Sequence, residues 1–150
     1  VGHAAVEALQ ASALDGVEFA TTDGELTRLV ELWQRCRLAV VIDAVVGGAE
    51  PGTIHALDTA VDTMPDWPQM LSSHRAGLAE AVALARTLDR LPDRLLVFGV
   101  EPADTAHGSE LSPAVAASMP ALLAGVSAAI HSARVAPSPP TAAPREGSCT

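Results

Sequence analysis

Two short, mainly apolar runs, each followed directly by an acidic residue, restrict the fold of this chain most. Residues 38–42 (LAVVI) lead into Asp43, and residues 94–100 (RLLVFGV) lead into Glu101. Runs of this length without polar alternation are typical of strands that are buried on both faces. A sheet buried on both faces needs helices on each side. We therefore predict an α/β protein, a three-layer α/β/α sandwich around a mostly parallel, twisted sheet.

Apolar residues at helical spacing predict the helices that cover this sheet. They are expected over the opening residues, over residues 25–35 and over residues 74–89, where Ser73 can act as the N-cap. Ser112 and Pro113 place a capping residue and a first-turn proline at the start of a last helical region. Pro120 should kink that region or split it in two, because proline lacks the backbone N–H that a helix interior needs.

Two further strands are expected, over residues 17–20 and 52–57. The second follows a Gly-rich loop at residues 45–51, which is too short for a helical crossover. We therefore expect strand 52–57 to run antiparallel at an edge of the sheet, one antiparallel strand in a mostly parallel sheet. Residues 58–73 contain several prolines and are expected to be irregular.

The two ends of the sequence give separate expectations. No capping residue, initiator Met or strand precedes the first helix, although an α/β fold usually begins with a buried strand. We therefore expect residues 1–133 to form one domain that is incomplete at its N-terminal side. Residues 134–150 are rich in Pro, Ala and Ser and are expected to be a disordered tail.

Charge and cysteine usage exclude several classes of protein. The chain has 9 basic and 18 acidic residues and a formal charge of −9, so it lacks the clustered cations that nucleic acid requires. We find no apolar run of membrane-spanning length and no signal peptide, and we expect a cytoplasmic protein without a membrane partner. Cys36 and Cys149 do not suggest a disulfide framework or a zinc site. The arginines beside Cys36 could lower the pKa of its thiol, but we expect it to be a partly buried thiol.

Candidate site residues follow from the strand ends, because ligands of α/β sheets bind at the carboxyl ends of the strands. Asp23, Asp43 and Glu101 each follow an expected strand, and His74 opens a helix. Carboxylates and an imidazole converging there would suit a divalent metal ion with oxygen and nitrogen ligands. Asp23 is expected to hold a turn. The remaining histidines show no ligand spacing and are interpreted as incidental: His3, His55, His107 and His131.

Five blocks in one order resemble the endopeptidases that mature [NiFe] hydrogenases. They are VVIDAV (40–45), PGTIHALD (51–58), SSHRAGLAEAVALARTLDRLP (72–92), FGVEP (98–102) and LSPAVAASMP (111–120). The resemblance covers the chain up to about residue 131. The stretch TTDGEL (21–26) is similar to a DGG element of the family, with Glu25 in place of the usual Gly.

The resemblance implies a site and a reaction. Asp43 and His74 would be the catalytic, metal-contacting pair, and a third, acidic ligand would lie just ahead of a glycine that matches Gly2. Such enzymes remove a C-terminal extension from the hydrogenase large-subunit precursor after nickel insertion. The precursor would be the partner and would supply the nickel; zinc or cadmium could occupy the same site.

Two alternatives stay open at this point. The chain could be a degenerate relative that binds the precursor or a metal without cleaving. It could also be a receiver-like signalling domain, whose phosphoacceptor aspartate likewise ends a buried strand. That class needs a lysine at the end of a late strand, and here the corresponding strand ends in GVEP (residues 99–102).

Overall fold

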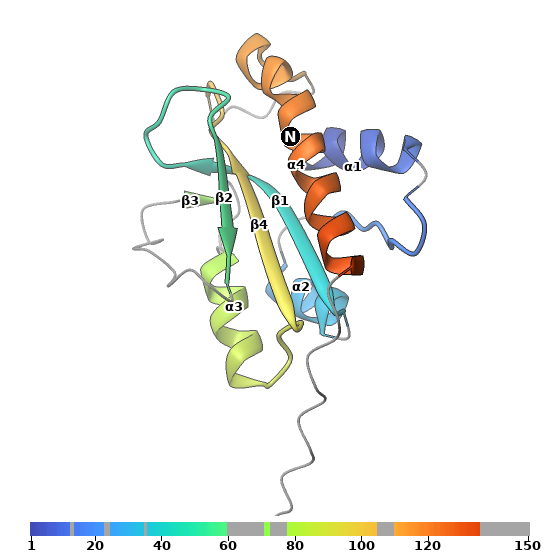
Figure 1. Cartoon of the computed structure of the whole chain (residues 1–150). Coiled ribbons are helices and arrows are strands. Elements are labelled where there is room, and N and C mark those ends of the chain that lie inside the picture. The colour runs from blue at the N-terminus through green and yellow to red at the C-terminus, as the bar shows by residue number, and fades with distance from the viewer. Residues whose placement is uncertain are drawn as a thin grey trace, which may run out of the picture.

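The computed structural model describes residues 1–12, 14–22, 25–34, 36–59, 71–72, 78–104 and 110–135. The helices are α1 (Gly2–Ala11), α2 (Leu26–Trp33), α3 (Leu78–Thr87) and α4 (Pro113–Val135). The strands are β1 (Leu38–Val46), β2 (Ile54–Asp58), β3 (Leu71–Ser72) and β4 (Arg94–Val100). The four strands form one sheet, with α1 lying beside α4 and α2 near α3 (Figure 1).

The two apolar runs are neighbours at the centre of this sheet. The strand order is β2-β4-β1-β3, and β1 pairs with β4 in parallel from Leu38 opposite Arg94 to Ala44 opposite Val100. β2 pairs antiparallel with β4 at one edge, as expected from its short connection. The α/β class is confirmed, but both outer strands of the described sheet are antiparallel where one was expected, because β3 also pairs antiparallel with β1.

Alternate residues of the central strands enter two separate hydrophobic clusters. Leu96, Phe98 and Val100 of β4 pack with α1 and α4 on one face. Leu95 and Val97 pack with α2 and α3 on the other face. Both faces of β4 are therefore buried, which is the three-layer arrangement that its uninterrupted apolar sequence predicts.

β1 extends further than predicted. It runs to Val46, so the expected loop at residues 45–51 begins two residues late and Asp43 lies inside the strand. Val45 is 2% exposed, and it pairs with Ser72 of β3. This extra pairing comes from a strand in a region expected to be irregular, and it could not be read from local sequence.

The expected strand at residues 17–20 is wrong. Those residues belong to no strand, although Val17 and Phe19 pack partly buried against the cluster formed by α1 and α4. Their alternation with polar neighbours resembles a half-buried strand, but alternation reports which side chains are buried and not which backbone groups pair.

α4 is one helix with Pro120 inside it, so the expected split is wrong. Pro120 and Ala116 are both exposed, and water can reach the Ala116 carbonyl that a proline cannot satisfy. α4 also runs through Val135, past the predicted start of the tail at residue 134, and residues 136–150 lie outside the described residues.

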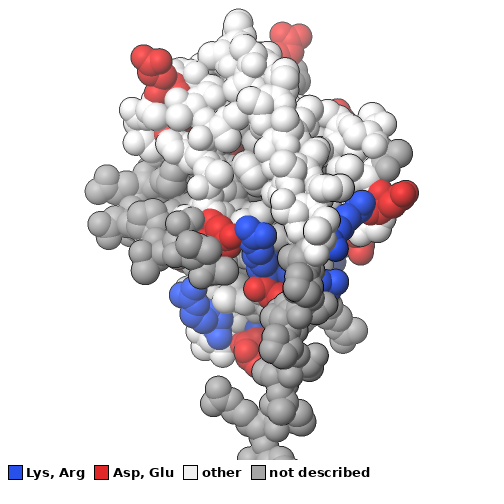
Figure 2. All heavy atoms as spheres, in the orientation of Figure 1, with Lys and Arg blue, Asp and Glu red and all other residues white. Residues whose placement is uncertain are grey.

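α4 is long and apolar enough, by length and composition alone, to cross a membrane. Four of its residues are nevertheless buried against the sheet at helical spacing: Val115, Leu122, Val126 and Ile130. Figure 2 shows an uncharged surface over much of α4, with acidic and basic side chains gathered below it. Of the most apolar stretch of α4, 22% is buried inside the protein.

Candidate functional site

Asp43 lies near the carboxyl end of the parallel β1–β4 pair. Its Cα partner on β4 is Gly99, and its carboxylate Oδ1 accepts a hydrogen bond from the backbone N–H of Ala44 at 2.8 Å. It has the same parity as Ala39 and Val41, which pack on the face covered by α2 and α3. Asp43 is half-buried and is directed to that face of the sheet.

His74 and Asp23 lie outside the described residues, so the structure does not place either side chain. The helix expected to start at His74 is described from Leu78 onward, as α3. Leu78 is buried in the cluster on the face to which Asp43 is directed. The chain between His74 and Leu78 spans at most about 14 Å when extended.

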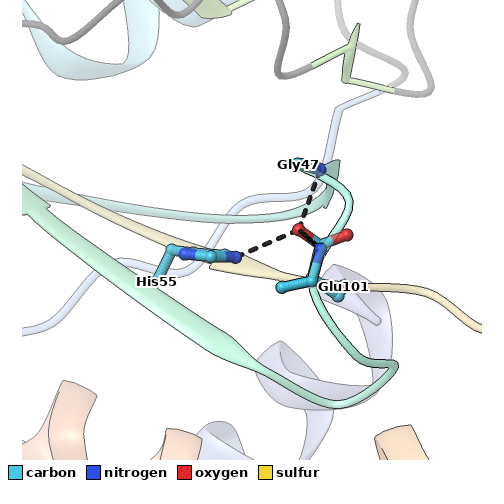
Figure 3. A network of polar contacts seen from close by, with 4 residues as sticks. Gly47, His55 and Glu101 are labelled. Carbon is cyan, nitrogen blue, oxygen red and sulfur yellow. Dashed lines mark hydrogen bonds and ion pairs between the residues drawn. The ribbon is translucent and has the colours of Figure 1, made fainter.

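Glu101 is the most buried charged residue of the described chain. It follows β4 directly, its side chain is 3% exposed, and its Oε1 accepts three hydrogen bonds. The backbone N–H groups of Gly47 and Ala49 donate at 2.8 and 3.3 Å, and the Nε2–H of His55 donates at 3.1 Å (Figure 3). This carboxylate therefore ties the turn after β1 to β2.

The backbone of Glu101 closes the same loop. Its N–H donates to the Thr53 carbonyl at 3.0 Å, and its carbonyl accepts from the Gly52 N–H at 2.8 Å. Gly52 has a φ of +87°, and a Cβ at this position would lie 2.6 Å from the Ala114 carbonyl oxygen. Only glycine fits at position 52. The loop that joins β1 to β2 therefore packs closely against Glu101, which follows β4, and against Ala114 at the start of α4.

His55 makes a contact with Glu101 that its spacing along the chain did not indicate. It lies on β2 opposite Gly99, the residue that also pairs with Asp43, and its side chain is 35% exposed. Paired residues on neighbouring strands direct their side chains to the same face. Asp43, Gly99 and His55 therefore form one row across three strands. Alternation within β2 could indicate the face of His55, but only the register of β4 shows what lies beside it.

Gly99 occupies the middle of this row because no side chain fits there. An added Cβ would lie 2.6 and 2.7 Å from the two methyl carbons of Val45 and 3.2 Å from its Cβ. The Val45 side chain thus fills the space above Gly99. Asp43 and His55 lie two strand spacings apart, roughly 9–10 Å between their Cα atoms.

The described residues alone do not make a metal site. Within them there is no group of three or more His, Cys, Asp or Glu side chains that could hold a metal ion. Glu101 is directed into hydrogen bonds with backbone amides and His55, and Asp43 is one carboxylate. A nickel or zinc site at Asp43 therefore requires donors from beyond the described residues, and a carboxylate with an imidazole is a suitable donor set for such ions.

Cys36 is not activated by its arginine neighbours, although the residue is exposed. Burial raises the pKa of the Cys36 thiol, and the negative charge of Glu18 raises it further. The Sγ–H also donates to the Leu32 carbonyl oxygen at 3.4 Å, which favours the protonated form. Cys36 is therefore a weak nucleophile at neutral pH.

An open cavity of about 930 Å³ lies along the edge of β1 that does not pair with β4. Every residue of β1 from Leu38 to Ala44 lines it, together with residues of α1, α2, α4 and the segment 16–22. β3 pairs only with Val45 and Val46, so in the described part of the chain no strand pairs with this edge ahead of Val45. Gly2 lies at one end, where a Cβ would be 2.8 Å from the Ile42 carbonyl oxygen.

The fold that positions Asp43 is an α/β fold, and solved structures share this fold. The hydrogenase maturating endopeptidase HybD from E. coli has a TM-score of 0.67 at 24% identity, over 87% of this chain and 82% of that one. An endopeptidase from Escherichia coli solved in solution has a TM-score of 0.73 at 27% identity, over the same two shares.

Sequence comparison assigns the family. The family model described as hydrogenase maturation protease matches residues 7–129, so this chain belongs to the hydrogenase maturation protease family. The hydrogenase expression/formation protein HupD of Thiocapsa roseopersicina is 33% identical over 119 residues. That alignment covers 76% of this chain and 53% of HupD, so the chain spans about half the length of this relative.

Proposed function

We propose that this chain carries the catalytic face of an endopeptidase that trims the C-terminal extension of a [NiFe]-hydrogenase large-subunit precursor after nickel insertion. The family match over residues 7–129 is the observation that carries the proposal. In this proposal Asp43 and His74 contact the nickel that the precursor brings, and cleavage follows only when that nickel is present. The metal is then a feature of the substrate and a checkpoint for its assembly.

The position of Asp43 supports this assignment. It is directed to the sheet face covered by α3, whose first residue, Leu78, is buried on that face close in sequence to His74. Leu78 and Asp43 both line the cavity beside β1, and at most about 14 Å of extended chain joins Leu78 to His74. Carboxylate and imidazole ligands suit borderline divalent ions such as nickel, and also zinc or cadmium.

The third, acidic ligand is proposed to come from chain ahead of Val1, the residue that precedes Gly2. Gly2 lies against the carbonyl of Ile42, the residue before Asp43 on β1, so chain that enters α1 passes close to Asp43. The open edge of β1 beside that point leaves room for added chain. The activity assay therefore uses the chain extended upstream of Val1.

The test is cleavage of the nickel-loaded precursor, followed by the mass of its large subunit. Asp43→Asn and His74→Ala should each lower the rate by about 10–100-fold or more, since each removes one metal contact. Asp89→Asn and His131→Ala are matched controls at exposed positions and should cleave like the unchanged chain. Nickel-free precursor should stay uncut. Equal cleavage by the Asp43 and His74 variants would refute the proposed site, and binding without any cleavage would favour the degenerate relative.

A further inference from the structure

The pair formed by half-buried His55 and buried Glu101 has no role in the proposed metal contact. His55 lies in the same row and on the same sheet face as Asp43, two strands away, with roughly 9–10 Å between their Cα atoms, and Val45 packs over Gly99 between them. Nε2 of His55 is already engaged with Glu101, so the ring does not offer that nitrogen to a metal ion at Asp43. The part of the ring that is exposed can instead contact the peptide.

The hydrogen bonds of Glu101 fix the tautomer of His55. Oε1 of Glu101 already accepts two backbone N–H groups, so it is an acceptor toward His55 and Nε2 of the ring carries the proton. In the neutral ring Nδ1 then bears a lone pair. Among the described residues no hydrogen bond to Nδ1 is present, while the side chain is 35% exposed.

We propose that His55 is a substrate-binding residue that accepts, through Nδ1, a hydrogen bond from a backbone N–H of the precursor's C-terminal segment. Glu101 is the positioning residue that holds the ring. This inference rests on the proposed function. The separation of His55 from Asp43 equals about three residues of extended peptide, so a segment whose nickel end lies at Asp43 reaches His55.

A purely structural role for the pair leads to a different expectation. Glu101 anchors the loop between β1 and β2 through Gly47 and Ala49, and the bond from His55 could simply complete that anchor. His55→Gln separates the two roles. The glutamine amide can donate to Glu101 as Nε2 does, but it places no acceptor at the position of Nδ1.

The decisive measurement is steady-state cleavage of the nickel-loaded precursor by the upstream-extended chain carrying His55→Gln. We expect KM to rise about 3- to 10-fold, the usual loss for one hydrogen bond, with kcat changed less than about twofold and the melting temperature unchanged. His131→Gln, at an exposed site on α4, is the matched control and should change neither constant. An unchanged KM overturns the inference. A fall of more than about 5 °C in melting temperature also overturns it, because it would show that the His55 ring has a structural role.

A binding measurement separates this inference from the proposed function. The probe is a fluorescein-labelled synthetic peptide that spans the precursor cleavage site, bound to the Asp43→Asn chain and followed by anisotropy. Adding His55→Gln to that chain should raise Kd by the same 3- to 10-fold, roughly the value of one hydrogen bond. If the extended chain cleaves nothing, the proposed endopeptidase fails, while a raised Kd still supports His55 as a peptide contact. An unchanged Kd overturns that contact even if cleavage is normal.

Discussion

Replacing Gly99 by alanine tests the packing that separates Asp43 from His55. The new Cβ would lie 2.6 and 2.7 Å from the methyl carbons of Val45, well inside contact distance. Valine cannot relieve this by rotating, because both methyl positions and its own Cβ at 3.2 Å are close, and β-branched side chains are stiff about χ1. Val45 is buried and its backbone pairs with Ser72 of β3, so the backbone must move instead.

The expected cost follows from two opposing effects. Overpacking a buried position destabilises by about 1–3 kcal/mol. Alanine in place of glycine in an extended strand recovers about 0.4–1 kcal/mol by restricting the unfolded chain. Gly99→Ala should therefore lower the free energy of unfolding by about 1–2 kcal/mol, a fall of about 2–8 °C in melting temperature for a domain of this size.

A double-mutant cycle with Val45→Ala shows whether this contact is the cause. Val45→Ala alone should cost about 1–3 kcal/mol through lost methyl groups and a cavity. In the double variant the new Cβ of residue 99 enters that cavity, so the combined cost should be smaller than the sum by about 1–2 kcal/mol. Urea unfolding followed by circular dichroism measures all three. Additive costs, or a Gly99→Ala protein as stable as the original, would refute the packing argument.

Two further predictions concern the loop after β1 and the thiol. Gly48 and Gly52 both have positive φ, but open space surrounds the first and the Ala114 carbonyl lies against the second. Gly48→Ala should cost about 1–2 kcal/mol by urea unfolding, and Gly52→Ala at least about 1 kcal/mol more; equal costs would contradict the close contact. Because its pKa is raised, Cys36 should hold less thiolate than a free thiol at each pH. In a Cys149→Ser chain at pH 8, iodoacetamide should react with Cys36 more slowly than it reacts with the thiol of glutathione. The two rates should become similar only at higher pH, and a faster reaction of Cys36 would show an activated thiol.

The central strands could be predicted from sequence because their burial on both faces leaves a continuous apolar run. β4 has the predicted bounds of Arg94–Val100, and β2 lies antiparallel at an edge as its short connection required. The failed strand at residues 17–20 shows the limit of the same reasoning. Its apolar side chains pack against the core, yet its backbone enters no ladder, and pairing is decided by neighbours that are distant in sequence.

The candidate site was predictable to a lesser degree. Asp43 could be found because it follows an apolar run, although β1 continues past it to Val46. His55 could not be found, because its importance comes from the register that places it beside Gly99 and within reach of Glu101. Histidine spacing along the chain holds no information about that register. The role of Glu101 was visible only as a strand-end position, without its hydrogen-bond partners.

The unpaired edge of β1 has a consequence for the behaviour of the protein in solution. From Leu38 to Ala44 one side of this strand bonds to β4, while the other faces a cavity without a described strand partner. Trp33 also lines the cavity, and within the described chain its indole N–H is buried with no acceptor. Such an edge is a template for any extended segment that offers carbonyl and amide groups, including the same strand of a second molecule. Colloidal stability of this chain should thus depend on what covers that edge, even though its net charge favours solubility.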